Sequence, residues 1–252
     1  MRHCVMALLM LLGAQAAVSD DAVPASMPET LAFNVSTGGH PPFTIVHGDG
    51  RVSGIFWDVL SAIADRFQVE LLAVQVPPKR SESLLLSGHV DVTMRAMEWV
   101  DDPQAFVFSD PVMMTRDALF VHRDSDRKID AVEDLEGTLL GRLGFHYPWL
   151  AERLQQEAVS LIPVQDQEPM LRRLYDGRTR FTGAISNLHA GYWTLKNVPW
   201  GDSIHEAPIR LDEVGFRLMF PPRHQALVPR INQELQRMQS SGELDRIIRA
   251  YQ

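Results

Sequence analysis

The chain has 252 residues, of which 45% are hydrophobic and 22% are charged, and its formal net charge is −8. This length and composition indicate a folded protein of one or two domains and exclude a disordered or collagen-like chain. The negative charge, with no basic run, argues against nucleic acid as a partner, and a single Cys excludes an intramolecular disulfide and a Cys-rich zinc site.

The N-terminus is typical of a secretory signal peptide. Arg2 precedes a short apolar run, and Ala14 and Ala16 have the small-x-small spacing of a cleavage site. A buried N-terminal helix or a membrane anchor is the alternative, but the run is shorter than the ~20 residues that span a bilayer. We predict a signal peptide over residues 1–16 and a periplasmic location. The mature chain then lacks Cys, because Cys4 lies in the leader.

Strand and helix patterns alternate along the first half of the chain. Apolar spacing and turn residues predict strands over 31–36, 69–76, 90–94 and a segment ending at 118–121, and helices over 56–67 and 81–87. A polar run at 122–128 then interrupts the alternation.

The alternation restarts beyond the polar run. The patterns predict strands over 139–143, 160–164, 181–186 and 214–220, helices over 149–157, 169–174 and 188–195, and two amphipathic helices at the C-terminal end. Alternating strands and helices form mostly parallel sheets that helices cover on both faces. Two such runs predict an α/β protein with two lobes.

Common catalytic and metal-binding motifs are missing from the sequence. It contains no G-x-S-x-G, no H-E-x-x-H and no phosphate-binding loop, and its histidines do not recur at the spacing of a local metal site. We therefore expect a protein that is not an enzyme and that holds no cofactor, no metal and no catalytic residue.

Ligand-binding residues are expected where strands end, because ligands of open parallel sheets bind beyond the carboxyl ends of the strands. If the two lobes face each other, the residues that follow four predicted strands line one cleft. These candidates are His40, Arg95, Glu98, Trp99, His146, Tyr147 and Asn187.

Two of these candidates lie close together after the strand at 90–94. Arg95 could hold a carboxylate in a bidentate fork, or it could pair with Glu98 or Asp101 on the surface. Trp99 could form one wall of a ligand site, or it could be a packing residue.

The candidates of the second half also have structural alternatives. His146 and Tyr147 precede a predicted helix N-terminus, where free N–H groups can bind an anion, but Tyr147 could simply pack. Asn187 could contact a ligand or cap the helix that follows it.

Several short motifs occur in a recognisable order. They are Pro-Pro-Phe at 41–43, Gly-Ile-Phe-Trp-Asp at 54–58, Gly-His-Val-Asp at 88–91, Phe-Ser-Asp-Pro at 108–111 and Ser-Gly-Glu-Leu at 241–244. Together with the leader, they resemble the bacterial extracellular solute-binding proteins of family 3, the periplasmic receptors of polar amino-acid uptake systems.

The resemblance implies a two-lobe type II periplasmic binding protein fold that closes on its ligand by a hinge. Crossover strands would lie near 118–121 and 214–220. The first lobe would contain residues 17–121 and 214–252, and the second lobe residues 122–213.

The sequence departs from this family at the expected ligand contacts. Family members that bind amino acids carry an S-x-T-x-x-R motif whose Arg holds the ligand carboxylate, but Asp102 stands at that position here. Asn187 lies near the position of the acidic residue that holds the ammonium group. Arg95 is the candidate replacement for the missing Arg, and an organic or aromatic acid or another small polar solute is as plausible a ligand as an amino acid.

Three functions follow as hypotheses. The first is a monomeric periplasmic protein that captures a small solute and delivers it to the membrane permease complex of an ABC transporter. The second is a dehydratase-like enzyme on the same scaffold, with Glu98 or Glu168 as the acid. The third is a ligand-sensing module for a membrane sensor.

Overall fold

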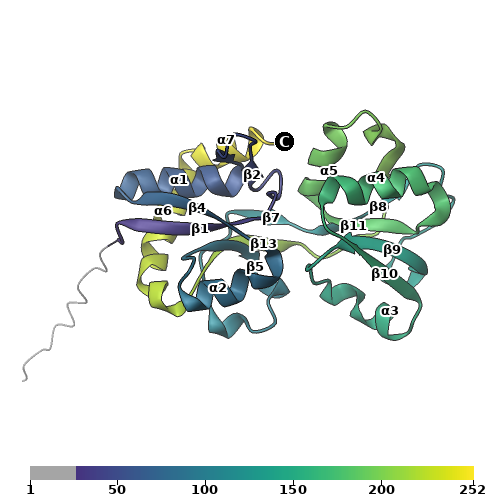
Figure 1. Cartoon of the computed structure of the whole chain (residues 1–252), viewed down its shortest axis with the longest axis horizontal. Coiled ribbons are helices and arrows are strands. Elements are labelled where there is room, and N and C mark those ends of the chain that lie inside the picture. Colours follow the sequence, from purple (N-terminus) through teal and green to yellow (C-terminus); the bar gives the residue numbers. More distant parts are fainter. Residues whose placement is uncertain (1–26) are drawn as a thin grey trace, which may run out of the picture.

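The computed structural model describes residues 27–252, so the predicted signal peptide over 1–16 lies outside the described residues. Two α/β lobes lie side by side and are joined by extended segments (Figure 1). Over residues 27–252, no helix has the length and apolarity that a membrane crossing requires.

The sheet of the first lobe combines parallel and antiparallel strands. β1 pairs with β4 in parallel, a single bridge joins Phe33 of β1 to Val92, and β13 pairs with β5, β6 and β7 in antiparallel fashion. A short hairpin of β2 and β3 lies beside this sheet. The strands are β1 (Thr30–Ser36), β2 (Ile45–Val46), β3 (Val52–Ser53), β4 (Glu70–Val76), β5 (Thr93–Ala96), β6 (Val107–Phe108), β7 (Met113–Thr115) and β13 (Val214–Phe220).

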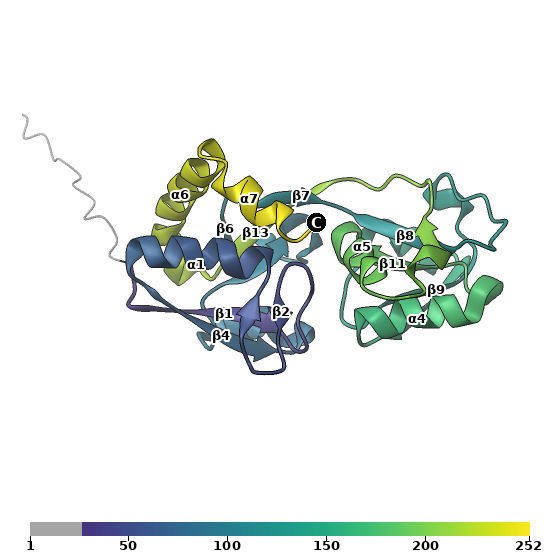
Figure 2. The ribbon, with the colours of Figure 1, turned by 90° about the horizontal axis from the view of Figure 1, so that it is seen from above.

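Helices cover both faces of this first sheet (Figures 1 and 2). One face packs against α1 (Ile55–Phe67), α6 (Val228–Ser240) and α7 (Glu243–Arg249), and the other packs against α2 (Ser81–Ser87). The first helix begins after Gly54, whose φ is 115° and where a Cβ would lie 2.6 Å from the carbonyl oxygen of Phe43. Glycine is therefore required at this position, and the close approach fixes the loop that carries His40.

The second lobe has a five-stranded sheet in the order β10-β9-β11-β8-β12. β9, β10 and β11 are parallel, whereas β8 is antiparallel to both β11 and β12. The helices α4 and α5 pack on one face of this sheet and α3 on the other. The elements are β8 (Asp117–His122), β9 (Gly137–Arg142), α3 (Ala151–Gln155), β10 (Val159–Val164), α4 (Gln167–Gly177), β11 (Gly183–Asn187), α5 (Leu188–Lys196) and β12 (Ile204–Glu206).

The lobe boundary lies earlier than the sequence indicated. The sequence predicts a crossover strand between the lobes near 118–121. This segment lies in β8, and its Ala118 and Phe120 are in the core of the second lobe. The chain therefore crosses at Arg116, between β7 and β8, and it returns through residues 207–213 into β13. The polar run at 122–128 follows β8 on the second lobe, and its polarity reflects exposure there rather than a linker.

The predicted alternation of strands and helices is confirmed in both lobes. The expectation of mostly parallel sheets is wrong, because β8 and β13 pair with their neighbours in antiparallel fashion. The strand expected over 90–94 is shifted to Thr93–Ala96, so Arg95 lies within β5 rather than after it. Instead of one helix over 149–157, the chain forms a 3₁₀ turn (Pro148–Leu150) followed by α3.

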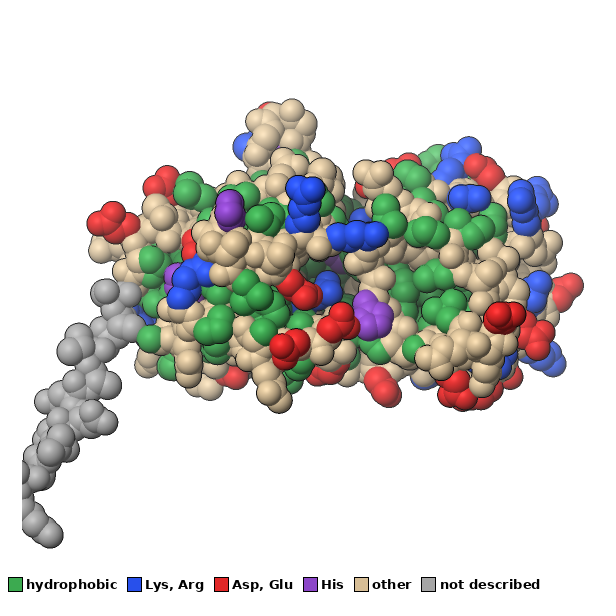
Figure 3. All heavy atoms as spheres, turned by 60° about the horizontal axis from the view of Figure 1, so that its bottom comes forward, with side chains coloured by type: hydrophobic (Ala, Val, Ile, Leu, Met, Phe, Trp, Pro, Cys, Tyr) green, Lys and Arg blue, Asp and Glu red, His purple; other side chains and the backbone are tan. Residues whose placement is uncertain are grey.

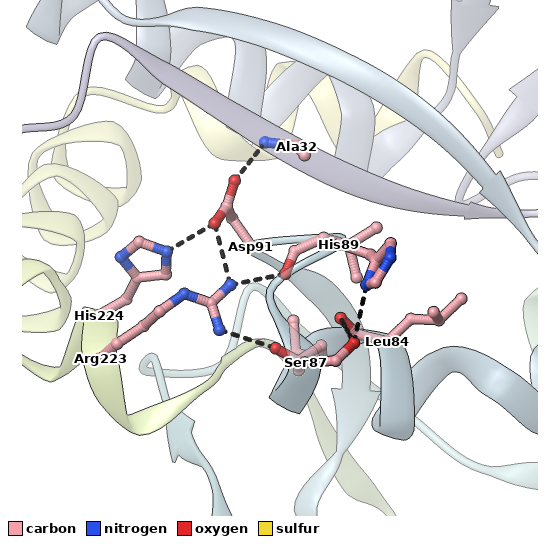
Figure 4. A network of polar contacts seen from close by, with 9 residues as sticks. Ala32, Leu84, Ser87, His89, Asp91, Arg223 and His224 are labelled. Carbon is pink, nitrogen blue, oxygen red and sulfur yellow. Dashed lines mark hydrogen bonds and ion pairs between the residues drawn. The ribbon is translucent and has the colours of Figure 1, made fainter.

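A polar network holds the start of β5 in place (Figure 4). Asp91 Oδ2 accepts a hydrogen bond from the Ala32 backbone N–H at 2.9 Å. Its Oδ1 lies 3.1 Å from Arg223 Nη2 and 2.7 Å from His224 Nε2. One carboxylate thus joins β1, the segment before β5 and the segment before α6, and it fixes the strand that carries Arg95.

Candidate ligand site between the lobes

A small pocket of about 60 Å³ lies between the two lobes. Its walls include Asn34, Arg95 and Trp99 of the first lobe and Phe145 of the second. A wider cavity of about 620 Å³ shares Arg95, Trp99 and Phe145 with it. Figure 3 shows one face of the molecule, which is hollowed at the junction of the lobes, with charged and His side chains gathered around the hollow.

Asn34, at the centre of β1, forms the polar floor on the first-lobe side. Its Nδ2 donates to the hydroxyl oxygens of Ser81 and, at 3.1 Å, of Thr93. Its Oδ1 is buried and has no hydrogen-bond partner among residues 27–252. Because an unpaired buried acceptor costs about 1–3 kcal/mol, this oxygen is a candidate contact for a bound solute.

Arg95 supplies positive charge to the same wall. Its Nη2 lies 3.2 Å from the Trp99 carbonyl oxygen and 3.4 Å from Glu82 Oε1. Its Nε is buried and finds no partner in the described part of the chain. Burial lowers the pKa of Arg95, while Glu82 and Asp101 oppose this change. A guanidinium stays protonated in proteins, so the Nε–H can donate to an anion.

His40 is buried between the lobes and is neutral. Its ring makes edge-on contacts with Phe43 at 5.1 Å and with Phe145 at 5.4 Å, measured between ring centroids. Burial, with the charges of Arg142 and Arg95, lowers the pKa of His40 to about 3. The imidazole therefore contributes an uncharged polar surface to the pocket.

The loop that follows β9 forms the second-lobe wall. The Arg142 guanidinium lies 5.0 Å from the centre of the Phe145 ring and donates from Nε to the Gln165 carbonyl oxygen at 3.1 Å. Gly144 has a φ of 83°, and a Cβ there would lie 3.0 Å from Cγ of Lys79 in the first lobe. Glycine therefore lets this loop approach the opposite lobe closely.

Four of the sequence-predicted residues line this pocket: His40, Arg95, Trp99 and His146. Trp99 packs edge-on against Phe216, with 5.3 Å between ring centroids. His146 is exposed at the mouth, where its Nδ1 lies 3.2 Å from Asp101 Oδ1 of the first lobe. The structure thus brings together residues that are up to about a hundred positions apart in the sequence.

The other three candidates lie elsewhere. Tyr147 is in the core of the second lobe, and its hydroxyl accepts a hydrogen bond from the Arg142 backbone N–H at 2.9 Å. Asn187 caps α5 by accepting from the His189 N–H at 3.0 Å and donates to Thr115 Oγ1 at 2.7 Å. Glu98 is exposed and lines a separate pocket at the hinge. None of the three is therefore placed to contact a ligand in the pocket.

The hinge pocket has a volume of about 710 Å³ and contains the buried Asp117. Its Oδ2 accepts a hydrogen bond from Trp149 Nε1 at 3.0 Å. Burial raises the pKa of Asp117 to about 6, against the effect of this hydrogen bond. Glu168, the other acid considered for an enzyme, lines a fourth cavity. Neither Glu98 nor Glu168 therefore reaches the pocket between the lobes.

Sequence reasoning missed Asn34, Thr93 and Phe145. Asn34 and Thr93 lie within strands, and a rule based on strand ends does not select such positions. A signal was present for Asn34, because this polar side chain lies between the apolar Phe33 and Val35 in the middle of a strand. Phe145 lies in the same predicted cleft loop as His146 and Tyr147, but it is not among the predicted ligand-binding residues.

No metal centre is apparent in the described residues, where no group of three or more His, Cys, Asp or Glu side chains is placed to hold an ion.

A sequence profile of the bacterial extracellular solute-binding proteins, family 3, matches residues 34–252. No curated protein sequence matches the chain closely enough to count as a relative.

Solved structures share the fold at low sequence identity. An ancestral arginine-binding protein bound to arginine has a TM-score of 0.76 at 21% identity, covering 89% of this chain and 99% of its own. A histidine kinase sensor domain with similarity to periplasmic binding proteins has a TM-score of 0.75 at 20% identity, with coverages of 88% and 95%. An ancestral amino acid-binding protein described as a precursor of cyclohexadienyl dehydratase has a TM-score of 0.74 at 17% identity, with coverages of 88% and 95%.

Proposed function

Because the chain belongs to the bacterial extracellular solute-binding proteins of family 3, we propose that it captures a small polar or carboxylate-bearing solute between its lobes. Closure about the crossover segments encloses the solute, and a few polar groups fix its orientation. The proposed role is binding rather than catalysis, and the position of Glu98 and Glu168 outside the pocket supports it.

The pocket around Arg95 is the observation that supports this function most strongly. It is lined from both lobes, so closure creates it and opening exposes it. Two buried polar atoms, Asn34 Oδ1 and Arg95 Nε, face no protein partner within residues 27–252. A solute that satisfies both atoms would therefore stabilise the closed state.

We further propose that the protein is exported to the periplasm and passes its solute to the permease of an ABC transporter. The family match and the N-terminal sequence pattern support this role. Its similarity to a histidine kinase sensor domain makes a membrane sensor the alternative partner. Cross-linking in cells followed by mass spectrometry distinguishes the two, because recovery of a kinase instead of a permease would contradict delivery to a transporter.

A thermal-shift screen of the purified protein against amino acids, organic acids and aromatic acids tests solute capture. A ligand present at about 100 times its Kd adds about 2.7 kcal/mol to the stability of the folded state, and the melting temperature rises accordingly. The absence of any shift across the three classes would contradict the proposed function. Turnover of prephenate or arogenate by the same sample would favour the enzyme instead.

A further inference from the structure

The lining of the pocket between the lobes contains a positive charge and no carboxylate, and the Glu82 carboxylate that pairs with Arg95 lines the wider outer cavity. Among the described residues that line it, Arg95 is the one permanently charged side chain, and none is Asp or Glu. An amino acid brings an ammonium group as well as a carboxylate, and a buried ammonium group needs an anionic partner. The pocket therefore offers a partner to an anion but not to an ammonium group.

Three acidic groups around the pocket lie outside its lining, and each of them has a partner. Glu82 and Asp101 line the wider outer cavity, where Glu82 lies 3.4 Å from Arg95 and Asp101 lies 3.2 Å from His146. Asp117 faces the hinge pocket and accepts a hydrogen bond from Trp149. A ligand held in the pocket around Arg95 therefore meets no carboxylate in the lining of that pocket.

The surroundings of His40 indicate that a second positive charge in the pocket is unfavourable. Burial disfavours a proton on this imidazole most strongly, and the guanidinium groups of Arg142 and Arg95 add to the effect. Its other close contacts are the rings of Phe43 and Phe145, which carry no charge. The same two guanidinium groups would repel a ligand ammonium placed nearby.

Asn34 and the size of the pocket indicate which second polar group the ligand carries and how large the ligand is. Asn34 Oδ1 is an unpaired acceptor, and a neutral hydroxyl can donate to it without bringing charge. The pocket volume of about 60 Å³ corresponds to roughly four to six groups of water size at ~10–15 Å³ each. This is the size of an acid with two or three carbon atoms.

We propose that the pocket selects a small hydroxycarboxylate over the amino acid of the same shape. The carboxylate accepts a hydrogen bond from Arg95 Nε, and the hydroxyl donates to Asn34 Oδ1. This inference rests on the proposed function, because it names the class of solute that the same pocket captures.

Calorimetric titration with matched pairs tests the selection. The pairs are glycolate and glycine, lactate and alanine, and glycerate and serine, with both enantiomers of each chiral compound. At least one hydroxy acid is expected to bind at least tenfold more tightly than its amino partner. Equal or tighter binding of the amino acid in every pair, or no binding by any of the compounds, would overturn the inference.

The titration results that would overturn the selection of a hydroxycarboxylate differ from those that would contradict solute capture itself. If none of the matched compounds binds but the broad screen yields a ligand, the solute class is wrong and solute capture stands. If the broad screen also yields nothing, solute capture itself is contradicted. The comparison of matched pairs uses the unmodified protein, so it does not depend on the folding of a variant.

Two substitutions then assign the selection to residues. Arg95→Gln is expected to weaken binding of the hydroxy acid at least thirtyfold, whereas Arg51→Gln, which changes an exposed arginine paired with Asp49, leaves it unchanged. Asn34→Asp places a carboxylate at the unpaired acceptor and is expected to shift the preference toward the amino acid at least tenfold. An unchanged preference in a folded Asn34→Asp variant would contradict the role of Asn34.

Discussion

His146 and Asp101 contact each other between the lobes, with 3.2 Å separating Nδ1 and Oδ1 at the mouth of the pocket. Both side chains are largely exposed, and exposed pairs contribute about 0.2–1 kcal/mol. Asp101→Asn is therefore expected to weaken ligand binding by no more than about fivefold, because it removes one contact between the two lobes.

The ligand Kd, measured by calorimetry at low and high salt, checks this prediction. The salt dependence of the Kd should be smaller in the variant than in the unmodified protein. Asp176→Asn is the matched control, since it breaks an exposed pair with Arg172 inside the second lobe. An equal effect of both substitutions would show that the Asp101 pair has no role in closure.

Asp117 reduces stability at neutral pH. Its pKa is raised from 3.8 to about 6 in the folded protein, mainly by burial. The folded state therefore keeps a proton that the unfolded state releases, and stability falls as the pH rises from about 4 to 6, by up to about 3 kcal/mol. Asp117→Asn keeps an acceptor for Trp149 Nε1 and is expected to remove this loss.

Urea unfolding of the Asp117→Asn variant at pH 4 and pH 7 measures the effect. The variant should gain stability over the unmodified protein at pH 7 and little or none at pH 4. A gain of the same size at both pH values would show that the carboxyl charge is not the cause.

His40 has the opposite pH dependence. Its pKa is lowered from 6.5 to about 3, first by burial and then by Arg142 and Arg95. The unfolded state binds a proton that the folded state excludes, so stability present above pH 6.5 is lost as the pH falls toward 3. In a His40→Gln variant, the free energy of unfolding should fall less steeply between pH 6 and pH 4.

The slope of the unfolding free energy against pH is the appropriate measurement for His40, since the packing lost with the ring lowers stability equally at every pH. His205→Gln is a control on an exposed histidine of β12. Identical slopes for His40→Gln and the unmodified protein would contradict a neutral, buried imidazole.

Asp91 is expected to stabilise the first lobe through the network in Figure 4. Burial alone would raise the pKa of Asp91, but hydrogen bonds from Ala32, His224 and Arg223 outweigh it and lower the pKa. Asp91→Ala leaves the Ala32 N–H without its acceptor, and such a loss costs about 1–3 kcal/mol. Chemical denaturation should show this decrease, whereas Asp49→Ala, on an exposed turn, should change little.

The fold was largely predictable from the sequence, because it follows from the local periodicity of apolar residues. The apolar spacing of α1 and of α6 predicts these helices, and the buried residues of both match that spacing. The sequence pattern puts the end of the first lobe at residue 121, after β8 instead of before it. The apolar residues of β8 predict a strand but do not indicate which of the two sheets it joins. Strand pairing with β11, a contact distant in sequence, decides that it belongs to the second lobe.

The site was only partly predictable, for the same physical reason. The position of Arg95 after an apolar run pointed to the cleft, and the structure places it there. Tyr147 follows β9 and Asn187 is the last residue of β11, but the Arg142 N–H and the first turn of α5 engage them. Whether a polar residue at a strand end meets a ligand or a backbone group depends on packing that the sequence pattern does not contain.

A crystal structure of the protein with the strongest ligand from the thermal-shift screen tests the central claim most directly. We expect the ligand between the lobes, with its anionic group on Arg95 and a donor on Asn34, enclosed by Trp99 and Phe145. A ligand found instead in the hinge pocket beside Asp117, or bound outside the space between the lobes, would contradict the claim that the pocket around Arg95 is the binding site.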